Sequence, residues 1–300
     1  MTSTLPNLGN VVSATVGETV FRVAPQTGAI TIPSGNGGRT SSGDSIVSMT
    51  ISTANHAHCQ DVIIDGTVTA TGSTNRAKNM RNFNISVAGN ITLNSQSGTG
   101  ATRTFQLKMP KDKSGTLYVG MDFPIKGDNE GGATGLATSS YTISLNAVNG
   151  NDISRSGQGR ATVRRSLRMV KTSDLSFGKI VRPSTGSSLV VLNSFNGART
   201  LSGSGVGIET PAPSRAAYTI TGEAAQIVSI TVPPSVSMTG PGPALTVNLT
   251  AFRPPPQNEL EDQGDGTGSY TFYVGGSFTA TSTTPTGTYS GVFNVSVSYN

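Results

Sequence analysis

The sequence closes on Gly291-Val-Phe-Asn-Val-Ser-Val-Ser-Tyr299, nine residues in which apolar and polar side chains alternate. Every second position is apolar: Phe293, Val295, Val297 and Tyr299. A period of two places alternate side chains on opposite faces of a β-strand. The stretch therefore predicts a strand with one face in a core and the other in water.

The same pattern occurs in the first half of the chain, where Tyr141, Ile143, Leu145 and Ala147 are separated by polar residues. Four stretches match in the same order, 152 to 160 residues apart. They are Pro25–Gly28 with Pro183–Gly186, Asn36–Gly43 with Asn196–Gly203, Leu117–Phe123 with Phe272–Phe278, and Tyr141–Leu145 with Phe293–Val297. Collinear matches of this kind predict a tandem duplication of one unit.

Composition agrees with two β-rich copies. The 300 residues are only 12% charged, against about 25% in an average domain, and they include 37 Gly, two His, one Cys and no Trp. Helical bundles need more helix-forming and charged residues, and one cysteine excludes a disulfide scaffold. No apolar run reaches the ~18–20 residues of a membrane-spanning helix. Short alternating stretches between turn residues predict an all-β chain of two tandem sandwiches.

We expect an N-terminal extension over residues 1–20 and a first β-sandwich over 21–150. A polar, Gly-rich linker over 151–160 and a second β-sandwich over 161–300 complete the predicted organisation.

The second copy carries motifs that resemble a group of bacterial surface proteins. It has Leu175-Ser-Phe-Gly178 near its start and Pro285-Thr-Gly-Thr-Tyr-Ser-Gly291 before the alternating strand. Over residues 165–300 it resembles a bacterial surface-domain family related to spore-coat-protein-U-like proteins and archaic chaperone–usher pilin subunits. The first copy lacks the opening motif and has Gly135-Leu-Ala-Thr-Ser-Ser-Tyr141 in place of the closing one, so only the internal repeat links it to the family.

The resemblance implies immunoglobulin-like subunits that lack their last strand and are completed by a strand from the next molecule. It also implies export through the periplasm, with a periplasmic chaperone, an outer-membrane usher and copies of the same chain as partners. The sequence stops one residue after the alternating strand. An edge strand with an apolar face readily accepts another strand, so we expect the row Phe293, Val295, Val297 and Tyr299 to be the acceptor.

The N-terminal segment offers a candidate donor strand, with every second residue on one face: Leu8, Asn10, Val12, Ala14 and Val16. We expect it to pair with the terminal strand of the next molecule. A parallel hypothesis has residues 160–170 complete the first copy within the chain, through Val163, Leu167 and Met169. The alternatives are that residues 8–16 are the first strand of the first copy and 160–170 the first strand of the second.

Little in the sequence points to chemistry. His56, His58 and Cys59 form the one metal-like cluster, and no second cluster supplies further zinc or copper ligands, so we expect no metal and no cofactor. No nucleophile elbow marks a hydrolase. Six cations between Arg155 and Lys171 lack the aromatic platform that single-stranded nucleic acid requires, so we expect a surface contact and no nucleic acid.

No signal peptide is visible at the N-terminus, which fits either a cytosolic protein or a chain whose signal has been removed. The resemblance favours a secreted, cell-surface protein without a membrane span. We expect a non-enzymatic structural subunit of a bacterial surface fibre, pilus or coat that polymerises by donor-strand complementation. The alternative is an adhesin module that binds carbohydrate or a host surface, although 6% aromatic residues and no Trp argue against a sugar-stacking face.

Overall fold

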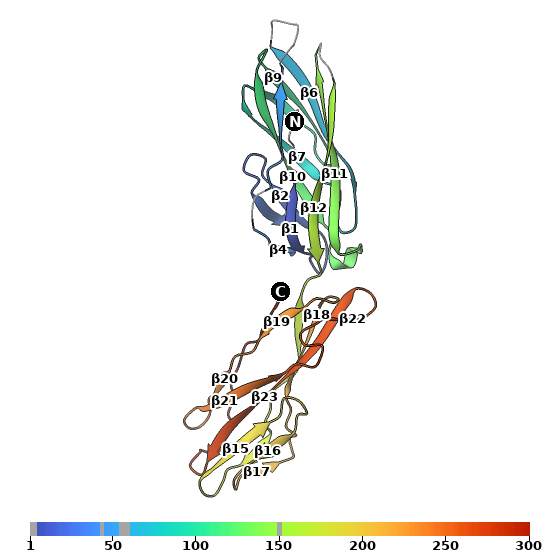
Figure 1. Cartoon of the computed structure of the whole chain (residues 1–300). Helices are drawn as coiled ribbons and strands as arrows, with labels where there is room; N and C mark the ends of the chain where they lie inside the picture. Colours follow the sequence, from blue (N-terminus) through green and yellow to red (C-terminus); the bar gives the residue numbers. More distant parts are fainter. Residues whose placement is uncertain (1–4, 43–44, 54–60, 149–151) are drawn as a thin grey trace. The chain divides into compact units, whose positions relative to one another are not determined.

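The computed structural model describes residues 5–42, 45–53, 61–148 and 152–300. Within these ranges the chain forms β-strands and one 3₁₀ turn, η1 (Asp128–Glu130), with no α-helix, which confirms the all-β fold class. The chain divides into unit 1, residues 1–166, and unit 2, residues 167–300. Unit 1 runs from blue to green in Figure 1, and unit 2 from yellow-green to red.

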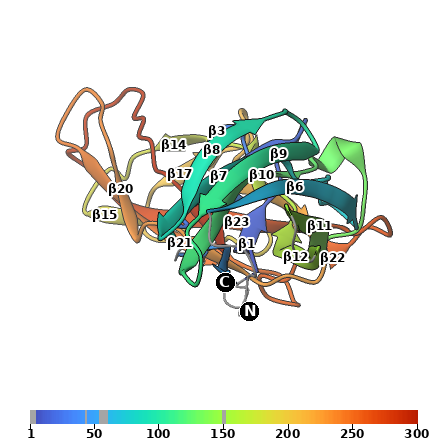
Figure 2. The same ribbon diagram turned by 90° about the horizontal axis from the view of Figure 1, so that it is seen from above.

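Unit 1 is a sandwich of two sheets. The larger has the order β4 (Gly38–Arg39), β1 (Asn7–Val12), β12 (Ile153–Arg164), β11 (Gly135–Ala147), β6 (Val62–Ser73), β9 (Thr102–Met109) and β8 (Thr92–Ser97). The smaller has the order β3 (Ile30–Ser34), β2 (Thr19–Val23), β10 (Ser114–Ile125) and β5 (Ser48–Ser52), and β7 (Arg81–Gly89) also pairs with β10. Figure 2 shows β6 and β9 running side by side.

One continuous apolar cluster fills the space between these sheets. Alternate residues of nearly every strand contribute to it, and Phe21, Phe83, Leu107, Phe123 and Val163 are completely buried. Few members of the cluster are only partly buried. Unit 1 is thus closed on both sides of its core.

A buried carboxylate makes unit 1 sensitive to acid. Asp122 accepts hydrogen bonds from Arg22 Nε at 2.7 Å and from Asn82 at 2.9 Å. Burial opposes ionisation, but these hydrogen bonds and the charges of Arg22 and Arg81 outweigh it, so the pKa of Asp122 lies below its usual value. A carboxyl whose pKa is lowered by folding stabilises the fold above its unfolded pKa of about 4 and loses that contribution as pH falls through the folded pKa.

We therefore expect the urea midpoint of unit 1 to fall between pH 5 and pH 2, and the fall to be smaller in Asp122→Asn. Parallel urea titrations of both proteins measure the difference. An identical pH dependence would contradict the assignment of this effect to Asp122.

Unit 2 has one large sheet and two small ones. In the large sheet β13 (Arg168–Ser173), β18 (Ala216–Glu223), β23 (Thr267–Thr281), β15 (Ser187–Leu192) and β16 (Arg199–Leu201) follow one another. β21 (Leu245–Phe252) and β22 (Glu261–Asp262) also pair with β23, and β20 (Ser235–Met238) pairs with β21. The small sheets are β14 (Lys179–Val181) with β17 (Val206–Ile208), and β19 (Val228–Thr231) with β24 (Ser296–Tyr299).

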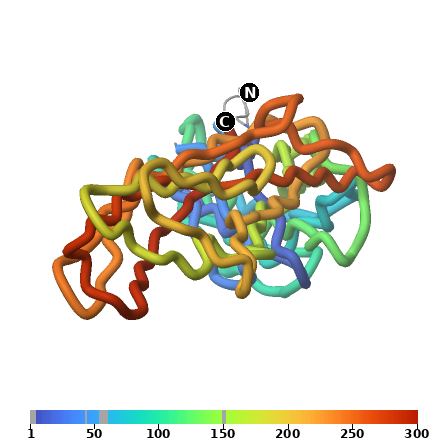
Figure 3. Tube along the Cα trace, turned by 90° about the horizontal axis from the view of Figure 1, so that it is seen from below, coloured from blue at the N-terminus to red at the C-terminus, as the bar shows by residue number. Residues whose placement is uncertain are grey.

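The loop between β20 and β21 lies beside residues 282–290, seen as orange and red loops in Figure 3. Thr239 and Ser290 exchange both backbone hydrogen bonds, at 2.8 and 2.9 Å. This contact brings the chain back toward the start of the terminal alternating stretch.

Each unit has its own long central strand, and in each unit this strand changes its pairing partner at a glycine. β10 pairs first with β5 and then with β2, and β23 pairs first with β18 and then with β15. Gly120 and Gly275 lie at these changes, where a Cβ would strike the backbone that ends β2 or β15. The match of Leu117–Phe123 with Phe272–Phe278 is therefore a true equivalence.

The match of Pro25–Gly28 with Pro183–Gly186 is wrong. The first segment forms the turn after β2, in which Gly28 N–H donates to Ala24 O at 3.0 Å. The same turn follows β15 in unit 2, where Gly197 N–H donates to Asn193 O at 2.9 Å, whereas residues 183–186 precede β15. The match of Asn36–Gly43 with Asn196–Gly203 fails for the same reason, because Asn196 belongs to that turn and Asn36 follows β3.

Two predicted boundaries are also wrong. The extension predicted over residues 1–20 is wrong for the described residues 5–20, because β1 is an inner strand of the larger sheet of unit 1. Residues 151–160 are not a linker, because β12 begins at Ile153 and unit 2 begins at Leu167 instead of residue 161. Polar, Gly-rich composition suggested a linker, but two of these glycines are packing sites: a Cβ on Gly157 would overlap the Tyr141 ring, and one on Gly159 would overlap Met80.

Candidate assembly site

The C-terminal segment, β24 and the residues just before it, presents a row of apolar side chains that its own unit covers only in part. Of the predicted strand over 291–299, only Ser296–Tyr299 is a β-strand. Phe293, Val295, Val297 and Tyr299 are half-buried against the core of unit 2, while the residues between them are exposed. β24 pairs antiparallel with β19, with Val228 opposite Tyr299 and Ile230 opposite Val297. Among the described residues β19 is its sole neighbour in the sheet. We call this row and the edge of β24 opposite β19 the acceptor face.

The equivalent strand of unit 1 is enclosed. β11 lies between β6 and β12, and its side chains Tyr141, Ile143 and Leu145 are 2%, 3% and 4% exposed. β11 contains the stretch Tyr141–Leu145, and the matched stretch Phe293–Val297 runs into the start of β24. Unit 1 has β12 and β1 beyond this strand, and the described part of unit 2 has no strand at that place.

The difference extends to the cores. The apolar residues of unit 2 form two clusters instead of one, and each has many partly buried members. Leu167, Met169, Val232 and Leu249 belong to this partly buried set, together with the acceptor face. Unit 2 therefore keeps more of its apolar side chains in partial contact with water than unit 1 does.

Tyr299 anchors the end of β24 to the large sheet. The backbone N–H of Glu223 donates to the Tyr299 hydroxyl at 2.7 Å. Gly222 makes room for this ring, because a Cβ there would overlap the hydroxyl. Position 299 is thus fixed to β18 as well as to β19.

The N-terminal candidate donor lies within unit 1. β1 pairs parallel with β12, with Asn10 opposite Thr162 and Val11 opposite Val163, and antiparallel with β4. The predicted alternation is wrong: Leu8, Val11 and Ala14 are buried, Asn10 is exposed and Val16 is 70% exposed. A register shift at Gly9, with φ of 69°, changes the face presented by the following residues.

The three candidate residues of the in-chain strand belong to two different strands. Val163 is completely buried in unit 1, where β12 pairs with β11 from Gly135 to Leu145. Leu167 and Met169 pack against the core of unit 2, and Met169 lies in β13. Residues up to Arg164 therefore complete unit 1, and those from Arg168 begin the strands of unit 2.

A charged cluster inside unit 1 holds the end of β1, and the sequence analysis missed it. The Arg76 side chain is 1% exposed, and its Nη1 donates to Asp128 Oδ1 at 2.5 Å. Ser13, just after β1, donates to the same oxygen at 2.6 Å, and Ser166 donates to Asp128 Oδ2 at 2.9 Å. We call these four residues the Asp128 clasp. A lone arginine between turn residues gives no sequence signal of such burial.

The backbone strengthens the clasp. Ser13 N–H donates to Arg164 O at 2.9 Å, and Asp128 N–H donates to Ala14 O at 2.8 Å. The clasp thus connects the segment after β1, the end of β12 and η1.

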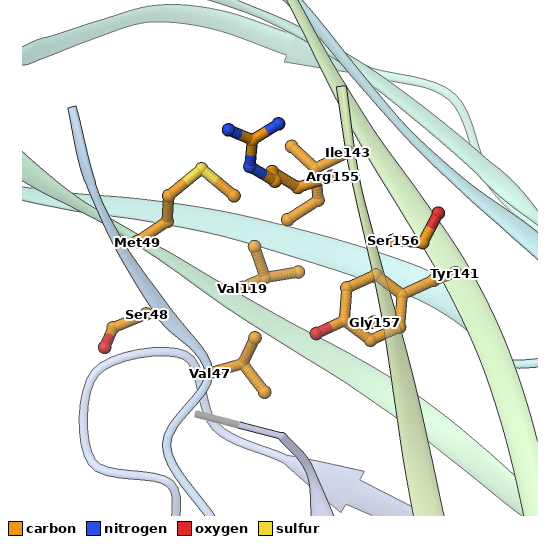
Figure 4. Close-up of a pocket in the computed structure, with 9 residues that line it drawn as sticks. All are labelled: Val47, Ser48, Met49, Val119, Tyr141, Ile143, Arg155, Ser156 and Gly157. Carbon is orange, nitrogen blue, oxygen red and sulfur yellow. The ribbon is translucent and has the colours of Figure 1, made fainter. Parts of the chain in front are cut away.

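A small pocket in unit 1 lies between β5, β10, β11 and β12 (Figure 4). About 270 Å³ of space lies inside it when the open solvent at its mouth is included, so little of it is enclosed. Val47, Met49, Val119 and Ile143 supply apolar walls, and Arg155 is the one charged lining residue. Burial raises the pKa of Tyr141 to about 12, so its phenol stays neutral. The pocket's apolar lining residues and Tyr141 belong to the core cluster of unit 1.

The described residues contain no group of three or more His, Cys, Asp or Glu arranged to hold a metal. The candidate cluster His56, His58 and Cys59 lies outside them. The basic stretch divides between the units, because Arg155, Arg160 and Arg164 lie in β12 and Arg168 and Lys171 in β13. In the described parts of the chain, no helix has the length and apolar character needed to cross a membrane.

Unit 2 is similar to a known sequence family. Residues 167–299 match a family described as a domain of unknown function (DUF4402). The match begins at the first residue of unit 2 and includes the acceptor face. No curated protein matches the sequence.

The solved structures similar to this chain include one from a pilus system. It is the crystal structure of the CsuC–CsuE chaperone–tip adhesion subunit pre-assembly complex from archaic chaperone–usher Csu pili of Acinetobacter baumannii. The similarity covers 83% of this chain and 91% of the other, with 10% identity and a TM-score of 0.32. At that score the strand pairing of this chain, and not the superposition, carries the argument about its function.

Proposed function

We propose that this chain is a structural subunit of a bacterial surface fibre, pilus or coat, and that a strand donated by a neighbouring subunit completes unit 2. The acceptor face carries this proposal: an alternating apolar strand with one described neighbour, beside a core that stays partly open. The role requires binding and no chemistry.

Strand addition matches what the face lacks. A donated strand would supply main-chain hydrogen bonds to the edge of β24 opposite β19, and its alternate side chains would cover the apolar row. Residues 291–299 carry no charged side chain. Charged edge residues are a common device against strand pairing, and this edge does not have them.

The same exposure suits an exported subunit that needs protection before assembly. An open apolar edge is an aggregation hazard, and a periplasmic chaperone would cover it until an outer-membrane usher joins the subunits. The chaperone, the usher and the surface location are proposed from the family resemblance of residues 165–300 and from the partly covered apolar row.

Completing unit 2 within the same chain tests the proposal. In unit 1, β12 follows β11 and pairs with it, so a sequence copy of residues 149–164 appended after Asn300 should return along β24. Covering about 100–150 Å² of apolar surface should raise the free energy of unfolding of unit 2 by about 3 kcal/mol. We expect the melting temperature of unit 2 to rise by roughly 10 °C, measured by calorimetry, with unit 1 unchanged.

The matched control has the same extension with Asp at the copied positions 153 and 157, which would place carboxylates on the apolar row. In this control the melting temperature of unit 2 should equal that of the unextended chain. If both extensions raised it equally, or neither did, unit 2 would not be an acceptor of a strand at β24, and the proposed function would fail.

A further inference from the structure

We propose that the outer face of the large sheet of unit 2 binds an acidic polysaccharide, with a sugar ring against Phe195 and a sugar carboxylate on Arg215. The acceptor face packs against the core side of unit 2, whereas this site lies on the side turned away from the core. The inference therefore goes beyond the proposed function and requires no strand addition.

Three aromatic side chains gather on this outer face, in a chain without Trp. Tyr273 in β23 lies between the buried Phe272 and Val274, so it points away from the core. Phe252 in β21 lies directly opposite Tyr273 in the sheet. Phe195 packs edge-to-face against Phe252, with ring centroids 4.8 Å apart, and remains 62% exposed.

The exposed ring of Phe195 is held in place before any ligand arrives. Its backbone N–H donates to Asn193 Oδ1 at 2.8 Å, and its carbonyl oxygen accepts from Arg215 Nη1. An ordered side chain loses little conformational freedom when a ligand covers it. The C–H groups on the flat side of a sugar ring suit the negative face of an aromatic ring.

Arg215 gives this site a positive charge. Its Cζ lies 3.4 Å from the centre of the Tyr273 ring, and its Nη1 donates to Ser194 O at 2.8 Å. Among the described residues, its Nε and Nη2 have no hydrogen-bond partner and no carboxylate pairs with it. These two nitrogens together match the two oxygens of a carboxylate. We call Phe195, Phe252, Tyr273 and Arg215 the Phe195 patch.

The rest of the outer face favours a sugar chain over a nucleic acid. Thr271, two residues before Tyr273, shares a hydrogen bond of 3.0 Å with Thr219, and these hydroxyls can exchange hydrogen bonds with sugar hydroxyls. Glu223 and Glu261 lie farther along the same face. A nucleic acid carries a phosphate on every unit, so its backbone would meet these carboxylates.

A peptide strand or an uncharged apolar partner fits the Phe195 patch poorly. At Tyr273, β23 is paired with β18 on one side and with β21 on the other, so no main-chain edge is open to an added strand. An apolar partner would bury the Arg215 charge without a counter-charge, which is unfavourable. The chemistry that remains is a flat ring with a carboxylate, within a chain rich in hydroxyls.

Titration calorimetry with two matched oligosaccharides tests the inference. A mannuronate hexasaccharide carries a carboxylate on every ring, and the mannose hexasaccharide with the same linkages carries none. We expect the mannuronate to bind with a Kd on the order of 0.1–1 mM, and the mannose hexasaccharide to bind at least about tenfold more weakly.

Two substitutions and two controls locate the site. Phe195→Ala and Arg215→Gln should each raise the Kd for the mannuronate hexasaccharide about tenfold. Val206→Ala removes an exposed apolar side chain of unit 2 outside the patch, and Lys179→Gln removes an exposed cation there. Both controls should leave the Kd unchanged. Because Arg215 also holds the turn at Phe195, amide chemical shifts of the unsubstituted chain give a second measure: they should move at Phe195 and not at Val206.

Four results would overturn the inference. The mannuronate hexasaccharide could show no binding at millimolar concentration, or the mannose hexasaccharide could bind equally well. Lys179→Gln could weaken binding as much as Arg215→Gln, which would indicate unspecific charge attraction. An oligothymidylate of the same length could bind more tightly, which would indicate a nucleic-acid site. The chain with the appended strand should bind the mannuronate as the unextended chain does, so failure of the proposed function would leave these results unchanged.

Discussion

Replacing Arg76 with alanine should lower the free energy of unfolding of unit 1 by about 3–5 kcal/mol, the usual cost of removing one partner of a buried ion pair. Arg76 is the largest completely buried side chain of the described chain, so its removal also leaves a cavity. Asp128 would keep Ser13 and Ser166 as donors but lose its cation. Since a domain is stable by only about 5–15 kcal/mol, unit 1 should be near the limit of folding.

Urea titration followed by hydrogen exchange of unit 1 measures this effect. The control is Lys108→Ala, which removes an exposed ion pair: Lys108 and Asp61 are 2.8 Å apart, with side chains 49% and 45% exposed. Exposed pairs contribute about 1 kcal/mol or less. Equal losses in the two variants would show that burial does not set the strength of the Arg76 pair.

The second large effect is expected at the glycines of the two central strands. Gly275→Ala would place a Cβ against Leu192 O and Ser194 N, and Gly120→Ala would place one 2.7 Å from Val23 O and 2.8 Å from Pro25 Cδ. Backbone atoms cannot move aside without separating strands, so each change should cost about 2–3 kcal/mol. Unit 2 has the more open core, so it should lose its cooperative unfolding transition in Gly275→Ala.

Gly72→Ala is the matched control, because Gly72 also lies in a strand and has no atom within 4 Å of the added Cβ. It should change the urea midpoint by a small fraction of the Gly120→Ala effect. Similar urea midpoints for Gly72→Ala and Gly120→Ala would mean that Gly120 is packed less closely against the end of β2 than the structure shows.

Side-chain periodicity predicts a large part of this molecule. The all-β class and the inward row from Phe293 to Tyr299 depend only on alternation, which is a local property of a strand. The equivalence of Tyr118-Val-Gly120 and Tyr273-Val-Gly275 is also visible in the sequence, because a glycine is needed wherever one strand changes partners at close range.

The errors arise where long-range packing overrides local pattern. Gly157 and Gly159 resemble linker residues, yet they are small because Tyr141 and Met80 occupy the adjacent space. At the N-terminus, one register shift at Gly9 breaks a period of two, so Val11 faces the core and Val16 faces water. The partner of Arg76 lies 52 residues away in the sequence, and no local pattern predicts that distance.

The parallel arrangement of β1 and β12 has a mechanical consequence. The chain enters unit 1 at the start of β1 and leaves it at the end of β12, and these two points lie at opposite ends of the paired strands. Tension applied along the chain therefore slides one strand lengthwise past the other and loads the whole ladder from Asn7 to Val12 at once. A ladder loaded in shear resists far more force than one opened from its end, so unit 1 is built to remain folded while the chain is pulled.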